Sequence, residues 1–143
     1  MKCKISRFFY LLLIFTLATC FFTGCQKNGE AKASVVKTSN DTVVIKVDEV
    51  NGDVTLLTVM QALKEGNQLD FNVENGMVTK INGVKNVSDF STCWMLYTSD
   101  TELANSSWGT ILYEDQVLGS AITGAKDLLV IEGALYVWNY KSF

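Results

Sequence analysis

From residue 42 to the end of the chain, short apolar runs alternate with polar turn residues, which is typical of a small domain built mostly of strands. Residues 42–48 are rich in β-branched side chains and predict a strand. Residues 54–64 change to a helical period, with apolar side chains at positions i, i+3, i+4 and i+7 on one face. These four side chains are Leu56, Val59, Met60 and Leu63. Gly66 follows where a helix stop is expected.

A hairpin is predicted after the helix. Residues 69–74 alternate apolar and polar side chains as a half-buried strand does, and residues 77–81 form the return strand. Asn75 and Gly76 join the two strands. Both residue types accept positive φ, so the sequence predicts a tight turn at this point.

The second half of the chain is rich in aromatic residues, and its apolar runs predict further strands. These strands span residues 93–98, 108–113, 127–131 and 134–140. A polar segment, residues 99–107, separates the first two, and Glu114 and Asp115 mark a turn after the second. The predicted fold class is therefore α+β, a small and mostly antiparallel β-sheet domain with one short helix.

The last predicted strand has two different faces. Tyr136, Trp138 and Tyr140 share one face, and Leu135 and Val137 share the other. Unless both faces of the sheet are covered, one of these sets faces away from the core. This alternation favours an exposed aromatic stripe, which on a soluble domain marks a binding surface.

The first 24 residues have the pattern of a secretory signal peptide. Lys2, Lys4 and Arg7 precede an apolar run of about 15 residues, slightly short for a membrane-spanning helix. The run ends in the pentapeptide FFTGC, in which Gly24 precedes Cys25. A small residue just before such a cysteine resembles the lipobox of bacterial lipoproteins. That resemblance implies cleavage after Gly24 and attachment of lipid to Cys25.

The lipobox also sets the predicted domain organisation. Residues 1–24 are the signal peptide, residues 25–41 are the lipidated cysteine with a polar tether, and residues 42–143 are the folded domain. The tether after the cysteine has a flexible span of roughly 20–25 Å. The protein is then exported and lipid-anchored to the bacterial cell membrane, facing outside the cytoplasm. The alternatives are a second lipobox that ends at Cys20 and an uncleaved N-terminal anchor.

Composition removes several function classes. None of the 143 residues is histidine, which excludes a Ser-His-Asp triad, an imidazole base and a His-ligated zinc. The net charge is −3, whereas a nucleic-acid partner requires a basic footprint. Cys93 is the one cysteine after the lipobox, so the mature chain has no pair for an internal disulfide, and a buried, inert thiol is expected there. The sequence predicts a protein that is not an enzyme and binds no nucleic acid.

Two sequence blocks carry a resemblance to a known family. They are GMVTKING, which begins at Gly76, and WMLY, which begins at Trp94. With the helix before them and the final Tyr-x-Trp-x-Tyr strand after them, residues 42–143 resemble the small β-rich C-terminal domain of vitamin B12 carriers of the transcobalamin type. That domain also recurs in bacterial surface lipoproteins. The resemblance implies a ligand-binding module, with cobalamin or another corrinoid as the ligand.

A corrinoid is large, flat and amphipathic, so its site requires an aromatic face with polar groups at the edge. The candidate ligand-binding aromatics are Trp94, Tyr97, Trp108, Tyr136, Trp138 and Tyr140. The candidate polar contacts are Ser99, Asn105 and Asn139. The other interpretation of each aromatic residue is core packing, because aromatic residues at strand spacing are usually structural.

Two further function classes stay open. The first is a divalent-cation module, because oxygen ligands suited to Ca²⁺ stand on both sides of a predicted hairpin. These ligands are Asp100, Glu102, Asn105, Glu114 and Asp115. Their spacing matches no calcium loop, so a solvated acidic loop is the other interpretation. The second class is a domain that contacts a neighbouring surface protein through its aromatic face.

Overall fold

A computed structural model describes residues 29–143, which form two antiparallel sheets and a helix. The large sheet has six strands in the order β1-β2-β9-β6-β8-β7. Its strands are β1 (Glu30–Thr38), β2 (Thr42–Asn51), β6 (Thr92–Thr98), β7 (Ala104–Tyr113), β8 (Gln116–Ala121) and β9 (Leu135–Ser142). The small sheet and the helix are β3 (Phe71–Glu74), β4 (Met77–Ile81), β5 (Val84–Lys85) and α2 (Leu56–Glu65). This architecture confirms a small β-rich domain with one short helix over the described residues.

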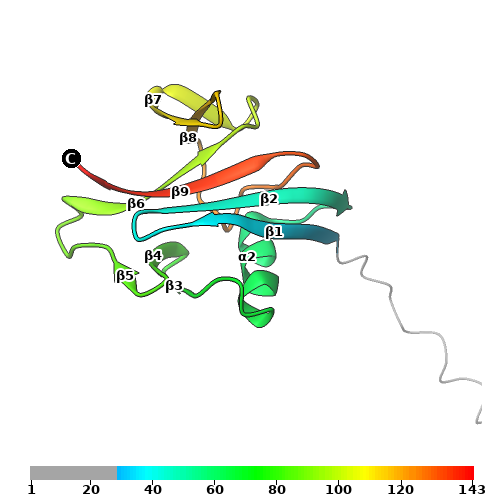
Figure 1. Ribbon diagram of the computed structural model, residues 1–143, viewed down its shortest axis with the longest axis horizontal. Helices are drawn as coiled ribbons and strands as arrows, with labels where there is room; N and C mark the ends of the chain where they lie inside the picture. Colours follow the sequence, from blue (N-terminus) through cyan, green and yellow to red (C-terminus); the bar gives the residue numbers. More distant parts are fainter. Residues whose placement is uncertain (1–28) are drawn as a thin grey trace, which may run out of the picture.

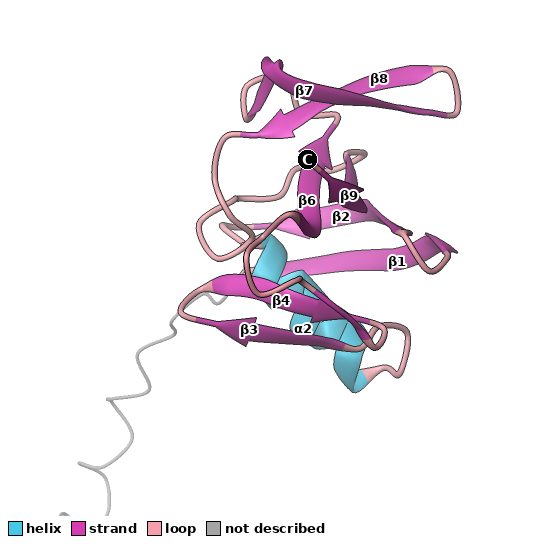
Figure 2. Cartoon of the chain, turned by 90° about the vertical axis from the view of Figure 1, so that its left-hand side faces the viewer, coloured by secondary structure: helices cyan, strands magenta, loops and turns pink. Residues whose placement is uncertain are grey.

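Both faces of the central strands β2, β9 and β6 are covered (Figures 1 and 2). Helix α2 and the small sheet lie on one side of these strands, and the β7–β8 hairpin lies on the other. The main core, on the helix side, includes Val43, Ile45, Met60, Ile81, Trp94, Tyr136 and Trp138. The second core, under the hairpin, consists of Val44, Tyr97, Leu118 and Val137. Each central strand therefore buries side chains in both directions.

Local sequence explains the helix and the first hairpin. The Oγ1 of Thr55 accepts a hydrogen bond from the N–H of Thr58 at the start of α2, and Gly66 ends the helix as predicted. The four apolar residues of the predicted helix face are all buried. Asn75 and Gly76 have φ values of 51° and 81°, which confirms the tight turn between β3 and β4.

The folded unit begins earlier than predicted. Residues 30–38, assigned to the polar tether, form strand β1, which pairs with β2 along the edge of the large sheet. Ala31, Ala33 and Val35 pack against the main core. Alanine has a weak strand preference, and the intervening residues Lys32 and Ser34 are polar, so the segment has a composition typical of a linker and its alternation was not recognised. The predicted signal peptide and Cys25 lie outside the described residues.

The strand predictions of the second half need three corrections. Strand β7 starts at Ala104, inside the segment predicted to be polar, and β8 was missed. Residues 127–131 form no strand and contribute an isolated bridge between Leu129 and Thr55. Their backbone groups bond instead to the chain before α2 and at its start, where Val54 accepts from Val130 and Leu128 accepts from Leu56. Within the described residues, no helix is long and apolar enough to cross a membrane.

Candidate functional site

The tryptophans at positions 94, 108 and 138 line one open groove of about 350 Å³, here called the tryptophan groove. The groove lies where the β3–β4 turn, strands β6 and β9 and the chain that follows β8 meet. Met77, Ile122 and Ala125 contribute to the same lining. These three residues were not predicted, because each is an ordinary apolar residue and only the fold brings Met77 of β4 next to the segment after β8.

The inner wall of the groove is built from two tryptophans that are each only 5% exposed. The indole N–H of Trp94 donates to the carbonyl oxygen of Val84 at 2.9 Å, which fixes its ring. The indole N–H of Trp138 is buried and has no acceptor among the described residues. A buried donor without a partner costs about 1–3 kcal/mol, so the wall holds an unsatisfied polar group.

Trp108 stands at the rim and is 64% exposed. The pairing of β7 with β8 shifts between Asn105 and Thr110, so the chain around Trp108 bulges out of the regular ladder. Gly109, at φ 136°, allows this bulge because other residues rarely adopt that conformation. The sequence analysis did not separate Trp108 from the other candidate aromatics, although the serines before it and the glycine after it are a signal of exposure.

None of the described residues that line the tryptophan groove has a charged side chain. Its polar side-chain groups are the hydroxyls of Ser120 and Thr123 and the indole N–H groups of the tryptophans. An ionised ligand group would lose its hydration here without gaining a counter-charge. The groove therefore suits a neutral, flat or apolar ligand surface.

The three tyrosines among the candidate aromatics lie elsewhere. Tyr97 is buried in the second core, and Tyr136 is buried in the main core. Tyr140 packs at the edge of the main core, donates its hydroxyl hydrogen to the carbonyl of Lys85 and lies 5.3 Å from the Trp94 ring. The prediction of an exposed stripe on β9 is therefore wrong. Both faces of β9 are covered, so its aromatic side packs against α2 and the small sheet.

The hydroxyl of Tyr136 makes the last strand sensitive to pH. Burial raises the pKa of Tyr136 above its ordinary value of 10.0, and the hydroxyl oxygen accepts a hydrogen bond from the N–H of Ile131 at 3.0 Å. In the unfolded chain the hydroxyl of Tyr136 ionises at about pH 10, whereas in the folded chain it is still protonated at that pH. This contribution to stability is thus complete below pH 10 and is lost as the pH rises toward the raised pKa.

We expect Tyr136→Phe to lose about 1–3 kcal/mol of unfolding free energy at neutral pH, because it leaves the N–H of Ile131 without its acceptor. Above pH 10 the variant should lose stability less steeply than the unmodified chain. Urea unfolding at several pH values below and above 10 measures both effects. Parallel pH profiles for the two chains would contradict the assignment to Tyr136.

The polar residues predicted to contact the ligand hold the fold together instead. The Oγ of Ser99 accepts from the N–H of Leu135, and the side-chain amide of Asn139 donates to the Oγ1 of Thr42. The Oδ1 of Asn105 accepts from the N–H of Ser107. None of the three predicted polar residues lines the tryptophan groove.

The predicted acidic cluster does not form. Asp100 and Glu102 precede β7, whereas Glu114 and Asp115 form the turn after it, so the ten residues of the strand separate the two pairs. The Oδ1 of Asp100 accepts from the N–H of Glu102, which is a local turn contact. In residues 29–143 no three acidic, cysteine or histidine residues gather into a metal-binding group.

Cys93 lies half-buried on β6, where burial raises the pKa of its thiol. A raised pKa keeps the thiol protonated at neutral pH, and a protonated thiol is a poor nucleophile. Its Sγ lies 3.9 Å from the Sδ of Met95, which is an apolar neighbour. The surroundings of this side chain therefore agree with the predicted inert cysteine.

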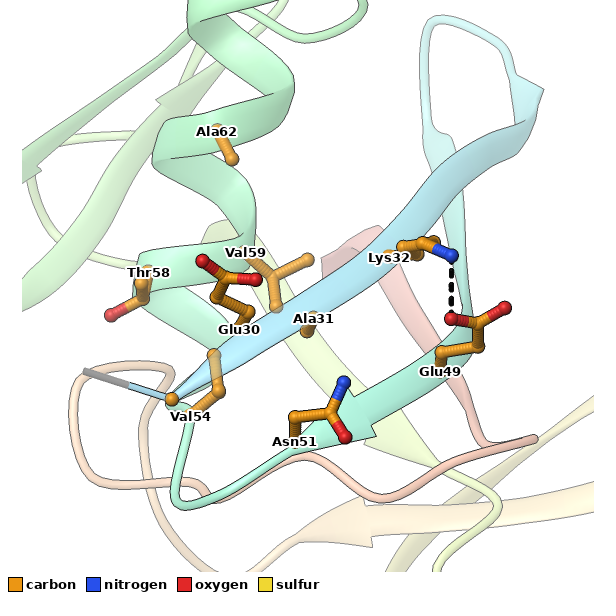
Figure 3. A pocket seen from close by; sticks show the side chains of 10 residues that line it. Glu30, Ala31, Lys32, Glu49, Asn51, Val54, Thr58, Val59 and Ala62 are labelled. Atoms are coloured by element: carbon orange, nitrogen blue, oxygen red, sulfur yellow. Dashed lines mark ion pairs between the residues drawn. The ribbon is translucent and has the colours of Figure 1, made fainter. Parts of the chain in front are cut away.

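A second groove, of about 320 Å³, runs between β1 and α2 (Figure 3). Lys32 and Glu49 form an ion pair of 2.6 Å at its side, and Val59 and Ala62 of the helix line the opposite wall. Both charged side chains are largely exposed, and their pairing joins the edge strand β1 to its neighbour β2. Its lining within residues 29–143 includes no aromatic side chain, so the tryptophan groove is the better candidate site.

Comparison with known proteins gives no match to any family model, curated protein or solved structure.

Proposed function

We propose that this chain is a non-enzymatic, lipid-anchored surface protein whose domain binds a neutral, flat, amphipathic small molecule in the tryptophan groove. Cobalamin or another corrinoid is the first ligand to test, since the resemblance to the transcobalamin-type domain points to that class. The observation that carries the proposal is the convergence of all three tryptophans of the chain on one uncharged groove. Export and attachment of lipid at Cys25 are the cellular part of the proposal, supported by the lipobox pattern.

The size and chemistry of the groove support partial enclosure of such a ligand. Small-molecule sites usually measure about 300–1,000 Å³, and this groove is near the lower limit. It accommodates one edge of a corrin and leaves the remainder exposed. A carbonyl oxygen at the ligand edge, reaching the N–H of Trp138 after a small side-chain shift, would remove the penalty of that unsatisfied donor.

Tryptophan emission provides a direct test, because every tryptophan in the chain lines the groove. We expect cobalamin to quench the emission of the chain from residue 26 onward in a saturable way and to co-elute with it on a desalting column. Trp108→Ala should weaken binding about tenfold, as the loss of an aromatic contact residue does. Leu112→Ala is the matched control, because Leu112 lies on the same strand, is equally exposed and does not line the groove.

Two results would count against the proposal. A colourless protein peak with unchanged emission overturns the corrinoid as ligand. Binding that Trp108→Ala and Leu112→Ala weaken equally overturns the groove as its site.

The second candidate function is contact with a neighbouring surface protein through the β7–β8 hairpin. Leu112 and Val117 face each other across this hairpin and are both exposed. Strand β7 is an edge of the large sheet and carries no charged residue or proline, the usual protections of an edge. Failure of ligand binding together with intact folding would favour this alternative.

A further inference from the structure

The end of the domain at which the described chain begins is closely packed. A Cβ placed on Gly29 would lie 2.6 Å from the carbonyl oxygen of Asp53 and 2.7 Å from a methyl group of Val54, so Gly29 rests directly on this turn. The carbonyl oxygen of Val54 accepts a hydrogen bond from the N–H of Val130 at 2.8 Å. The segments that contain Gly29, Val54 and Val130 therefore pack one against the next at one end of the molecule.

Two apolar side chains project from the segment around Val130. Val130 is buried, while its neighbours Leu129 and Ile131 are 44% and 47% exposed. Next to the buried Val130, the side chains on either side point away from the core. An exposed leucine and an exposed isoleucine therefore stand close to the point where the chain continues toward Cys25.

The length of chain before Gly29 limits how far this end can be from the proposed lipid anchor. Three residues, 26 to 28, lie between Cys25 and Gly29, so the Cα atoms of Cys25 and Gly29 can be at most about 14 Å apart. The tether expected from the sequence covered residues 25–41, but β1 takes up residues 30–38 of it. Figure 1 shows the C-terminus at the opposite end of the large sheet from the start of β1. The end at which β1 starts is therefore the end held closer to the proposed anchor.

We propose that Leu129 and Ile131 dock on the lipid surface and hold this end of the domain against the membrane. The inference rests on the proposed lipid anchor at Cys25. Asp127 and Glu132 flank the two apolar residues in the sequence, and Asp53 precedes Val54, which pairs with Val130, so the surface suits zwitterionic rather than anionic lipid. Two partly exposed aliphatic side chains bind a membrane weakly by themselves. An anchor within about 14 Å of Gly29, at the same end of the domain, raises their effective concentration at the membrane to the millimolar range.

The test uses the full chain, acylated in bacteria and reconstituted into phosphatidylcholine vesicles, in a Cys93→Ser background. An environment-sensitive fluorophore is attached at Ile131→Cys or, as a matched control, at Val36→Cys. Val36 is also β-branched and 47% exposed, but it lies near the far end of β1, about 23 Å along the strand from Gly29. The backbone N–H of Ile131 keeps its bond to Tyr136 in the variant, and circular dichroism confirms that each labelled chain is folded.

We expect the probe at position 131 to shift to the blue on vesicles and to be quenched at least twofold by brominated lipids, with neither effect at position 36. Equal signals at the two positions, in a chain that floats with the vesicles, would overturn the docking surface alone. A chain without fatty acid on Cys25 that stays in solution would overturn the proposed anchor and the docking surface with it.

Discussion

Replacing Trp94 by alanine is expected to lower the free energy of unfolding by about 3–5 kcal/mol. The side chain is almost completely buried in the main core, and its indole N–H donates to Val84 of β5. Its ring also lies against that of Tyr140 on β9. The substitution leaves a cavity between the two sheets and an unpaired carbonyl on Val84. A loss of this size is a large part of the total stability of a small domain, about 5–15 kcal/mol.

Trp108→Ala is the matched control for Trp94→Ala, since both residues line the same groove but only Trp94 is buried. We expect the control to change the unfolding free energy by less than about 0.5 kcal/mol. Urea denaturation followed by far-ultraviolet circular dichroism measures both variants. Similar losses in the two would contradict the assignment of Trp94 to the core. The same contrast explains why Trp108, and not Trp94, is the position at which ligand binding can be tested.

Replacing Leu118 by alanine is expected to cost about 2–5 kcal/mol and to loosen the β7–β8 hairpin more than the rest of the sheet. Leu118 is completely buried and is one of the four buried residues of the second core. The hairpin joins β6 through only two register pairs, Tyr97 with Ser120 and Thr98 with Gly119. Packing of Leu118 against the sheet therefore supplies much of what holds the hairpin in place.

Amide hydrogen exchange measures the predicted loosening of the β7–β8 hairpin separately from the rest of the sheet. In Leu118→Ala the exchange of residues 104–121 should accelerate more than that of β2 and β9. Val117→Ala is the control, because Val117 is the adjacent residue on the exposed side of the same strand. Uniform acceleration across the whole sheet would show that the second core is not a separate support for the hairpin. The rim residue Trp108 belongs to this hairpin, so the result also bears on the groove.

Features that depend on neighbours in sequence were predictable. The face of α2, its end at Gly66 and the turn at Asn75 and Gly76 follow from side-chain period and backbone preference over a few residues. The pairing of β1 was not predictable in the same way. Its small and charged residues become a strand only because β2 supplies hydrogen-bond partners and the main core accepts one face.

The candidate site shows the same division. The sequence singled out six aromatic residues, and tertiary structure separated them into three that line the groove and three that do not. Alternation correctly placed Tyr136 and Trp138 on one face of β9, opposite to Val137. Whether that face met solvent depended on α2 and the small sheet, which come from other parts of the chain.

The sequence by itself determined the strand-rich composition, the helix, the tight turn and the lipobox pattern before Gly29, because each depends on residue type and short-range spacing. Only the tertiary structure decided which apolar side chains are covered. A side chain is buried when other residues pack against it. Those residues are often distant in the sequence, so the local pattern does not identify them. The exposed Leu129 and Ile131 are an example, since their place at the same end of the domain as Gly29 arises from the contact of Gly29 with Val54 and of Val54 with Val130.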